Sequence, residues 1–345
     1  MNKLIFIVLF LPLFFVACGG GDSDNDNGGE TPDGSGLKFS VDRNSIYKSG
    51  YDLATFTVKY DGIDVTEKSR IYERVTGAFL KGNTFKTTQA GTYVFTAEYK
   101  GEVSEEIEVT TMNEEYFQAN LFMMHFTSTD CPNCPRMVTW INAAKELVPD
   151  RIVKISVHGP LNEPDPMQID AYWRPLVEQY KVPGYPIVML NCKRSWNTAE
   201  GTNDLEEFLP EKTNTGIAID TKIEGDKAII NLKVKTMLGF EKPSRISIVI
   251  VEDNLIYDQK NGNSTDRNTV HDDVVRRYLT DVLGDKEPDL AAGKEFTKEY
   301  TYDISPLLIR DNLKIVVYVM NGDSGYLLNC REVKLGKSVD YQTIE

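Results

Sequence analysis

The hydrophobic pattern of this 345-residue chain changes twice, and these changes limit the folds open to it. Residues 37–112 contain short alternating apolar runs separated by turn sequences, as half-buried strands do. Residues 113–212 alternate apolar strand runs with helical patterns, which is typical of α/β structure. Residues 213–345 return to strand patterns around one helical pattern at 270–282. We therefore expect a multidomain α/β plus all-β protein with three folded segments.

The start of the chain has the pattern of an export signal. One lysine precedes an apolar run at residues 4–16, which is shorter than the ~20 residues that span a bilayer. Ala17 before Cys18 resembles the bacterial lipobox, whose cysteine is acylated and becomes the first residue of the mature chain. We expect a lipoprotein signal peptide at 1–17 and membrane attachment through lipid on Cys18. The alternative is an ordinary secretory signal with an incidental cysteine.

Residues 18–36 are expected to form a flexible, lipid-anchored tether. Five acidic residues and no basic residue follow Cys18 in this glycine-rich stretch, which has too little apolar surface to fold. It resembles the export signal by which Bacteroidetes lipoproteins reach the outer face of the outer membrane. That resemblance implies an outer-membrane location at the cell surface, with the periplasmic face as the alternative.

The overall charge excludes one class of partner. The chain has 52 acidic and 38 basic residues and a formal net charge of −14. Binding to nucleic acid depends on lysine and arginine at the phosphates, so we expect no nucleic-acid partner. No motif points to a cofactor or to a metal site, and we expect neither.

Residues 37–112 are expected to be a spacer. The segment contains no cysteine or histidine and no unusual acidic cluster. Its strand pattern resembles the immunoglobulin-like modules of bacterial surface proteins, which implies an antiparallel β-sandwich.

Chemistry is expected at the pair Cys131 and Cys134, which lies between a predicted strand and a predicted helix. Cys131 at the helix N-cap would favour the thiolate and act as the nucleophile. Cys134, one turn later, would resolve the mixed disulfide. Asp130 and Asn133 oppose this prediction, because an adjacent carboxylate disfavours a thiolate and redox-active pairs differ at both positions. The pair is therefore either redox-active or a stable structural disulfide.

The segment 113–212 resembles the thioredoxin fold through this pair together with Val182-Pro183-Gly184-Tyr185-Pro186-Ile187. The resemblance implies that Pro186 is the cis-proline whose loop faces the two cysteines. His125, six residues before Cys131, is either a proton-transfer group or a core histidine bonded to the backbone. His158 is expected either at the same sheet edge as the cysteine pair or as a satisfied loop histidine.

The two remaining cysteines, Cys192 and Cys330, lie in similar contexts near predicted strand ends. An oxidising compartment would allow a disulfide between them. The alternative is a pair of buried free thiols that pack as small apolar side chains.

The order of these motifs, followed by Val270-His271-Asp272-Asp273-Val274-Val275-Arg276 in a β-rich C-terminal sandwich, resembles the Bacteroidetes outer-membrane family Omp twenty-eight from about residue 113 onward. The resemblance implies a surface protein with an adhesin or receptor role and a protein or glycan partner. Two hypotheses follow. One is a surface lipoprotein that binds a partner on a thioredoxin-like scaffold, and the other is an exported thiol-disulfide oxidoreductase that uses Cys131 and Cys134.

Overall fold

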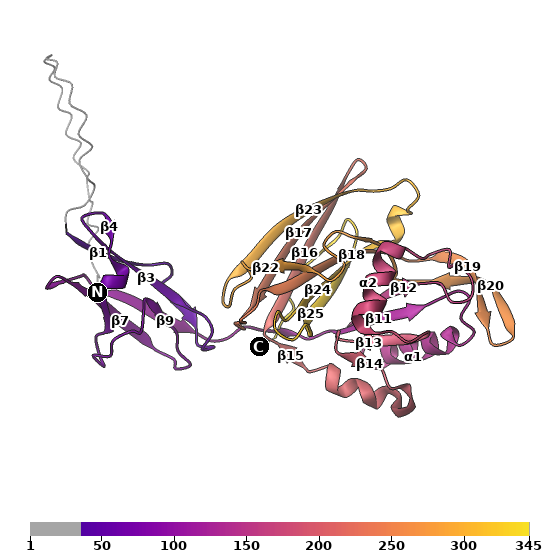
Figure 1. The fold of residues 1–345 in the computed structure, drawn as a ribbon, viewed down its shortest axis with the longest axis horizontal. Helices are drawn as coiled ribbons and strands as arrows, with labels where there is room; N and C mark the ends of the chain where they lie inside the picture. Colours follow the sequence, from indigo (N-terminus) through magenta and orange to yellow (C-terminus); the bar gives the residue numbers. More distant parts are fainter. Residues whose placement is uncertain (1–35, 345) are drawn as a thin grey trace, which may run out of the picture.

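The computed structural model describes residues 36–344 of the chain. The expected signal peptide at 1–17 and the expected lipid site at Cys18 lie outside these residues. Within them, 47% of the residues are in strands and 13% in helices. No helix in this range is long and apolar enough to cross a membrane. Figure 1 shows a small β-module at the N-terminal side, followed by a larger body.

Residues 37–112 form two β-sheets whose inner faces share one apolar core. Alternate residues of β3 (Ala54–Tyr60) face inward, so that Phe56 and Val58 pack with Phe95 and Ala97 of β7 (Thr92–Tyr99). The other strands are β1 (Leu37–Val41), β2 (Ser45–Tyr47), β4 (Ile63–Asp64), β5 (Arg70–Glu73), β6 (Thr84–Phe85), β8 (Glu102–Val103) and β9 (Ile107–Met112).

The N-terminal module contacts the body through a buried ion pair. Asp52 is 1% exposed and lies 2.8 Å from Arg43, which also donates a hydrogen bond of 3.2 Å to the carbonyl of Gly293. A Cβ at Gly293 would lie only 2.1 Å from Asp52 Cγ, and the residue has a φ of +69°. Glycine is therefore required at this contact.

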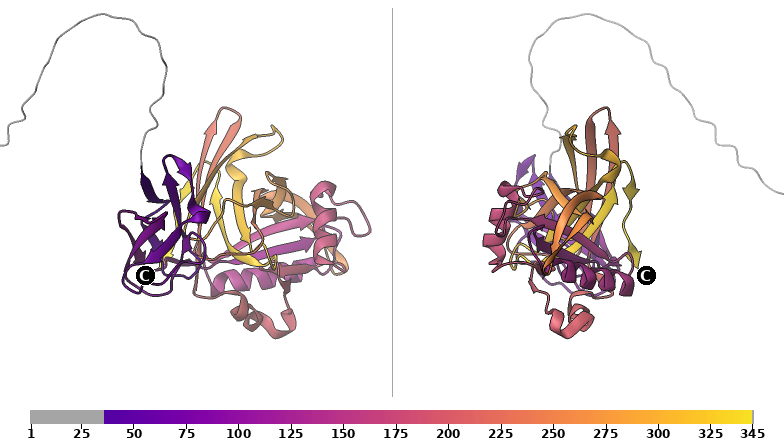
Figure 2. Two further views of the ribbon diagram at one scale, coloured as in Figure 1. Left: turned by 60° about the vertical axis from the view of Figure 1, so that its left-hand side comes forward. Right: turned by 90° about the vertical axis from the view of Figure 1, so that its right-hand side faces the viewer.

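The body is organised around one nine-stranded sheet. Its order is β14-β13-β11-β12-β21-β18-β24-β25, with β22 also paired to β18. Strands β11 and β12 are parallel, and β12 also pairs in parallel with β21, so that strands distant in the sequence complete one sheet (Figure 2). Its strands are β11 (Leu121–Thr127), β12 (Ile152–His158), β13 (Ile187–Leu190), β14 (Arg194–Ser195), β18 (Ser244–Glu252), β21 (Val274–Tyr278), β22 (Asp285–Glu287), β24 (Leu313–Met320) and β25 (Leu327–Lys334).

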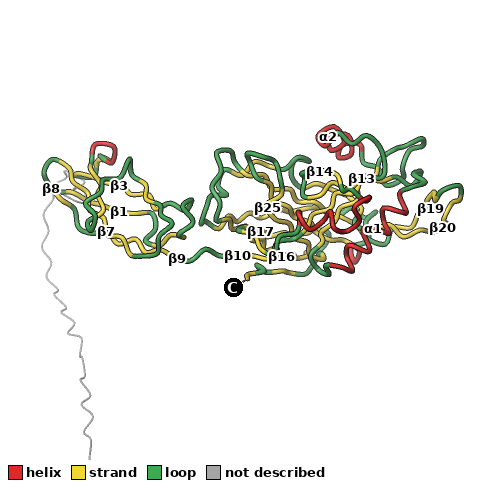
Figure 3. Tube along the Cα trace, turned by 90° about the horizontal axis from the view of Figure 1, so that it is seen from below, coloured by secondary structure: helices red, strands yellow, loops and turns green. Residues whose placement is uncertain are grey.

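Different elements cover the two faces of the nine-stranded sheet. On one face, a four-stranded sheet covers β18 and β24, and helix α1 (Cys134–Leu147) covers β11 and β13. Helix α2 (Asp170–Tyr180) packs on the other face, opposite α1 (Figure 3). The four-stranded sheet contains β16 (Thr215–Glu224), β17 (Lys227–Thr236), β23 (Glu295–Asp303) and β26 (Ser338–Val339).

The remaining elements are short or stand apart from these layers. A three-stranded sheet joins the beginning and the end of the body, and a separate hairpin extends from the nine-stranded sheet. These elements are β10 (Tyr116–Gln118), β15 (Lys212–Thr213), β27 (Thr343–Ile344), β19 (Leu255–Asn261), β20 (Ser264–His271) and the 3₁₀ segments η1 (Thr66–Lys68), η2 (Thr198–Phe208) and η3 (Arg310–Asn312).

The fold class predicted from the sequence is wrong. We expected a thioredoxin-like α/β domain beside a separate β-sandwich, but the described chain is mostly β and shows no clear α/β domain of that type. The strands of 113–212 continue directly into strands of the C-terminal segment, through β12 and β21. The physical reason is that the apolar pattern of a buried strand predicts the strand itself. It does not predict which other strand forms hydrogen bonds with it.

The helical insertion expected at 270–282 is also wrong. This region contains the end of β20 and all of β21, and Val274 and Val275 are buried in the large sheet. β-branched valines favour strands, and this preference prevails over the helical spacing of the apolar residues. The domain boundaries proposed from the sequence, including the spacer role of 37–112, stay predictions.

Candidate functional site

Cys131 and Cys134 form a disulfide, with Cα atoms 5.4 Å apart. Helix α1 begins at Cys134, and its N-cap is Asn133. Cys131 therefore lies two residues before the N-cap, in the preceding turn and near the start of the helix. Each cysteine is only 1% exposed.

The hairpin β19–β20 covers the turn that carries the disulfide. The amide of Gln259 is 5% exposed and lies within 3.2 Å of three backbone carbonyls in that turn. The amide N–H of Gly262 donates a 2.9 Å hydrogen bond to the carbonyl of Pro132. Buried carbonyls need such partners, so the hairpin closes the turn as well as covering it. The three carbonyls belong to Ser128, Thr129 and Cys131.

The carboxylate of Asp130, next to the disulfide in the sequence, is paired. Its carboxylate forms an ion pair with Lys260 of the hairpin and accepts a hydrogen bond from the backbone of Asn162. The contact with Lys260 holds the pKa of Asp130 below its ordinary value. The carboxylate thus attaches the hairpin to the turn.

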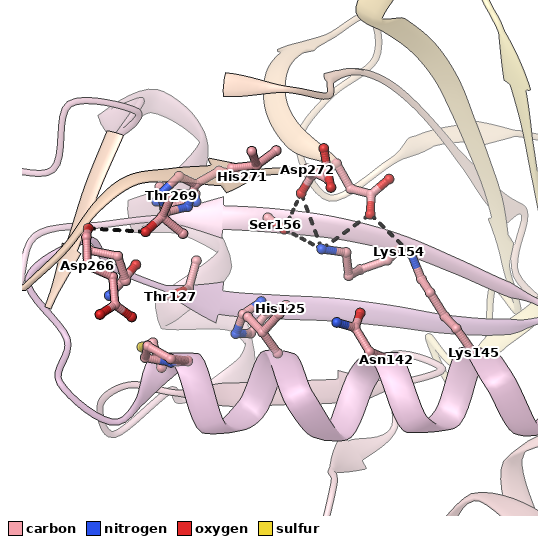
Figure 4. Close-up of a pocket in the computed structure, with 17 residues that line it drawn as sticks. His125, Thr127, Asn142, Lys145, Lys154, Ser156, Asp266, Thr269, His271 and Asp272 are labelled. Atoms are coloured by element: carbon pink, nitrogen blue, oxygen red, sulfur yellow. Dashed lines mark hydrogen bonds and ion pairs between the residues drawn. The ribbon is translucent and has the colours of Figure 1, made fainter. Parts of the chain in front are cut away.

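A cavity of about 260 Å³ lies beside the disulfide. Its walls come from α1, β11, β12 and the hairpin β19–β20, and Cys134 lines it whereas Cys131 does not. Figure 4 shows His125, Lys154 and Ser156 on the strands, with Asn142 and Lys145 on the helix below them.

The polar lining results from alternation along two strands. On β11 the residues facing α1 change from Met123 to His125 and Thr127. On β12 Lys154 and His158 line the cavity, whereas the alternate residues between them belong to the apolar core of the opposite face. The sheet face under α1 is therefore apolar at one end and polar at the other.

A buried ion network forms the inner end of the cavity. Asp273 is 2% exposed and lies 3.2 Å from Lys154 and 3.5 Å from Lys145, with Lys314 as a third cationic partner. Burial alone would raise the pKa of Asp273, but the three lysines hold it well below its ordinary value. Burial lowers the pKa of Lys154, and Asp273 opposes that shift. These charges are tolerated because they are paired.

His125 is 2% exposed, and its Nε2 has no hydrogen-bond partner within the described residues. Burial, together with Lys154 and the other two histidines, keeps the pKa of His125 well below its ordinary value. The ring is therefore neutral and available to a ligand. It is not the backbone-satisfied core histidine that one reading of the sequence favoured.

His158 is the last residue of β12. Its Nδ1 lies 3.0 Å from Asp165 Oδ2, so the ring is satisfied on one side. It also lines the cavity beside Cys134, at the edge where the cysteine pair lies. His271, at the end of β20, completes the set, and its Nε2 is also buried without a partner within residues 36–344.

The other predicted site residues lie away from this cavity. Tyr185–Pro186 is a cis peptide bond, but Pro186 does not line the cavity. Cys192 and Cys330 are free thiols, so the disulfide considered for them is absent. Both are buried in the core between the large sheet and α2, where they pack as apolar side chains.

Sequence reasoning missed Lys154, Asp273 and His271 as parts of a site. The only available signal was the alternation of polar residues in 154–158, within a run that otherwise predicts a buried strand. His271 was assigned to a helix, and nothing in its sequence position points to β12.

Part of the chain is similar to a known protein family. Residues 174–339 match the family described as outer membrane protein Omp28. This Omp28 region is just under half of the chain and shorter than the stretch from residue 113 onward that the sequence suggested. The family description confirms the outer-membrane location predicted from the sequence. The Omp28 region contributes the hairpin β19–β20 to the cavity, whereas β11, α1 and β12 precede it.

Three solved structures are similar to this chain at low sequence identity. HBP35 of Porphyromonas gingivalis is 17% identical, with a TM-score of 0.51 over 64% of this chain and 76% of that chain. A protein from Agrobacterium tumefaciens is 14% identical, with a TM-score of 0.40 over 64% and 96% of the two chains. A domain of the outer membrane lipoprotein Omp28 from P. gingivalis is 19% identical, with a TM-score of 0.25 over 36% and 89%. No curated protein matches this chain.

Proposed function

We propose that this protein is a lipid-anchored binding protein of the outer membrane, displayed at the cell surface and attached through Cys18. In this proposal Cys131 and Cys134 form a structural disulfide, and the adjacent cavity is the binding site. The Omp28 match supports the membrane location, and the lipobox-like sequence at Cys18 supports the anchor.

The observation that carries the proposal is that the disulfide is buried under the hairpin β19–β20. Thiol-disulfide exchange requires a thiolate to reach one sulfur along the axis of the bond. Both cysteines are 1% exposed, and the carbonyls around them bond to Gln259 and Gly262 of the hairpin. An incoming thiol would have to displace the hairpin or pass through the cavity that Cys134 lines. This arrangement favours a static bond over the oxidoreductase alternative.

The cavity has features expected of a binding site. Polar groups converge from four elements, and two histidine Nε2 atoms are left without partners in the described chain. Buried polar atoms are normally satisfied, so unpartnered ones directed into a cavity indicate a ligand. Val138 and Val270 form part of its lining and are 42% and 53% exposed, which places apolar surface at the opening for a protein or glycan partner.

A redox assay on the full-length protein in detergent tests the central claim. We expect no reduction of insulin disulfides above background, and no change with Cys131→Ser. Cys192→Ser is the matched control, because it removes a buried thiol away from the cavity. Reductase activity that disappears with Cys131→Ser but persists with Cys192→Ser would establish the oxidoreductase alternative instead.

The anchor and the membrane face have their own test. Cys18→Ala should release the protein from the membrane fraction, and protease added to intact cells should degrade the wild-type protein. Protection of the wild-type chain in intact cells, with degradation after lysis, would contradict display at the cell surface.

A further inference from the structure

All three histidines of the chain line one cavity. The sequence contains only three, and they lie far apart at positions 125, 158 and 271. They come from β11, β12 and β20, and the fold brings all of them to the same wall and opening. Imidazole is the side chain best suited to bind borderline transition metals, so this grouping points to a specific ligand chemistry.

His158 is oriented as metal-binding histidines are. Its Nδ1 lies 3.0 Å from Asp165, and that carboxylate also accepts hydrogen bonds from the backbone of Thr129 and Met167. The carboxylate thus accepts from two backbone N–H groups and faces the ring of His158 through the Nδ1 side. This arrangement fixes the ring and leaves Nε2 as the nitrogen that can bind an ion.

His271 supplies a second lone pair. Its Nε2 is buried and has no hydrogen-bond partner within residues 36–344, so this nitrogen is free to bind an ion. The rings of His158 and His271 have centroids 5.5 Å apart. A Zn–N bond of about 2.0–2.1 Å places a ring centroid roughly 3.2 Å from the ion, so two imidazoles on one tetrahedral ion have centroids roughly 5 Å apart. The observed separation fits a shared ion.

The charges around the cavity favour a cation near this pair. Asp266, Asp272 and Asp273 line the cavity together with Lys145 and Lys154, so its carboxylates outnumber its lysines by three to two. Lys154 already pairs with Asp273 and lies four residues before His158 on β12, about 13 Å along the strand. A cation at His158 therefore avoids the buried lysine.

We propose that His158 and His271 bind one divalent transition metal ion of the Zn²⁺ or Cu²⁺ type, whose other coordination positions are open to water or to a bound ligand. Within residues 36–344 no group of three His, Cys, Asp or Glu side chains is placed to hold a metal. The protein thus supplies two ligands, and His125 is not one of them. Asp165 is a positioning residue that fixes the ring of His158.

The proposed metal site rests on the proposed function in one respect only, which is that the cavity binds a ligand. The insulin assay reports on the disulfide and is independent of metal titration, so the two proposals fail separately. Metal binding together with reductase activity would overturn the proposed function and leave the metal site standing. Absence of both would overturn the metal site alone.

The test is titration of the full-length protein in detergent with ZnCl₂ and with CuSO₄, followed by calorimetry. We expect one ion per chain and at least a tenfold loss of affinity with His158→Gln or His271→Gln. Asp165→Asn should weaken binding about 10- to 100-fold, as loss of a supporting carboxylate does. Thr265→Ala is the matched control and should stay within about twofold of the wild type, since it changes an exposed residue of the same hairpin that does not line the cavity.

Two further measurements keep the proposal falsifiable if a variant misfolds. X-ray absorption of the wild-type complex should show two imidazole ligands. The thermal midpoint of the wild type should rise with Zn²⁺ concentration, because a ligand that binds only the folded state stabilises it. A midpoint that does not move, three imidazole ligands, or equal loss of binding with Thr265→Ala would each overturn the two-histidine site.

Discussion

One face of the nine-stranded sheet is covered in two different ways, and the difference locates the candidate site. At the β18–β24 end, isoleucines such as Ile248 and Ile315 pack against a second sheet in a wholly apolar core. At the β11–β12 end, α1 and the hairpin β19–β20 cover histidines and a buried lysine-aspartate network around a cavity. Buried polar and charged groups cost stability unless they are paired, so their concentration at one end indicates function there.

The largest expected effect comes from breaking the ion network. Asp273→Asn removes the carboxylate that three lysines share and leaves Lys154 buried without its partner. Loss of one member of a buried pair costs about 3–5 kcal/mol, and we expect the free energy of unfolding to fall by that amount in urea titration. Asp266→Asn, an exposed change in the same cavity, should stay within about 0.5 kcal/mol. Equal effects of the two substitutions would show that burial at this end carries no cost.

A smaller effect is expected from loosening the hairpin. Gln259→Ala removes the amide that bonds to the turn of the disulfide, which should cost about 1 kcal/mol. The Cys131–Cys134 bond should then be reduced faster by dithiothreitol, as measured by thiol alkylation and mass spectrometry. Thr265→Ala, at an exposed position of the same hairpin, is the control. An unchanged rate of reduction in Gln259→Ala would mean that the hairpin does not protect the bond.

A third effect is absent at neutral pH and appears only in acid. The pKa of His271 is lowered to about 4 in the folded protein, and that of His125 is lowered well below its ordinary value. The unfolded chain therefore binds more protons at these positions than the folded chain, and stability present above pH ~6.5 is lost as the pH falls toward 4. His271→Gln should flatten the fall in thermal midpoint between pH 6.5 and 5. Ile248→Val, at the apolar end, should lower the midpoint at all pH values and leave the slope unchanged.

The sequence predicted several parts of this picture from local signals. The apolar run at 121–126 and the helix pattern ending before Pro149 correspond to β11 and α1, because alternation, helical spacing and helix breakers act over a few residues. The cysteine pair and the two histidines at 125 and 158 were found because they lie close to those elements.

The rest depended on contacts between distant residues. The pairing of β12 with β21 joins positions 156 and 274, and only this pairing completes the large sheet that replaces the predicted α/β domain. The same pairing brings Asp273 to Lys154. His271 reaches the other histidines at the end of the hairpin β19–β20, which the sequence analysis did not predict, so neither the charge network nor the histidine cluster could be predicted from spacing.

The walls of the cavity lie on both sides of residue 174, where the Omp28 region begins. A gene fragment that encodes only the Omp28 region would retain His271 and Gln259 but would lose His125, His158 and both bonded cysteines. Sequence similarity over residues 174–339 alone therefore does not show whether a related protein has the cavity. Whether a relative has the cavity depends on the residues before 174, which supply β11, α1 and β12. Both parts of the chain must be present together for the cavity to form.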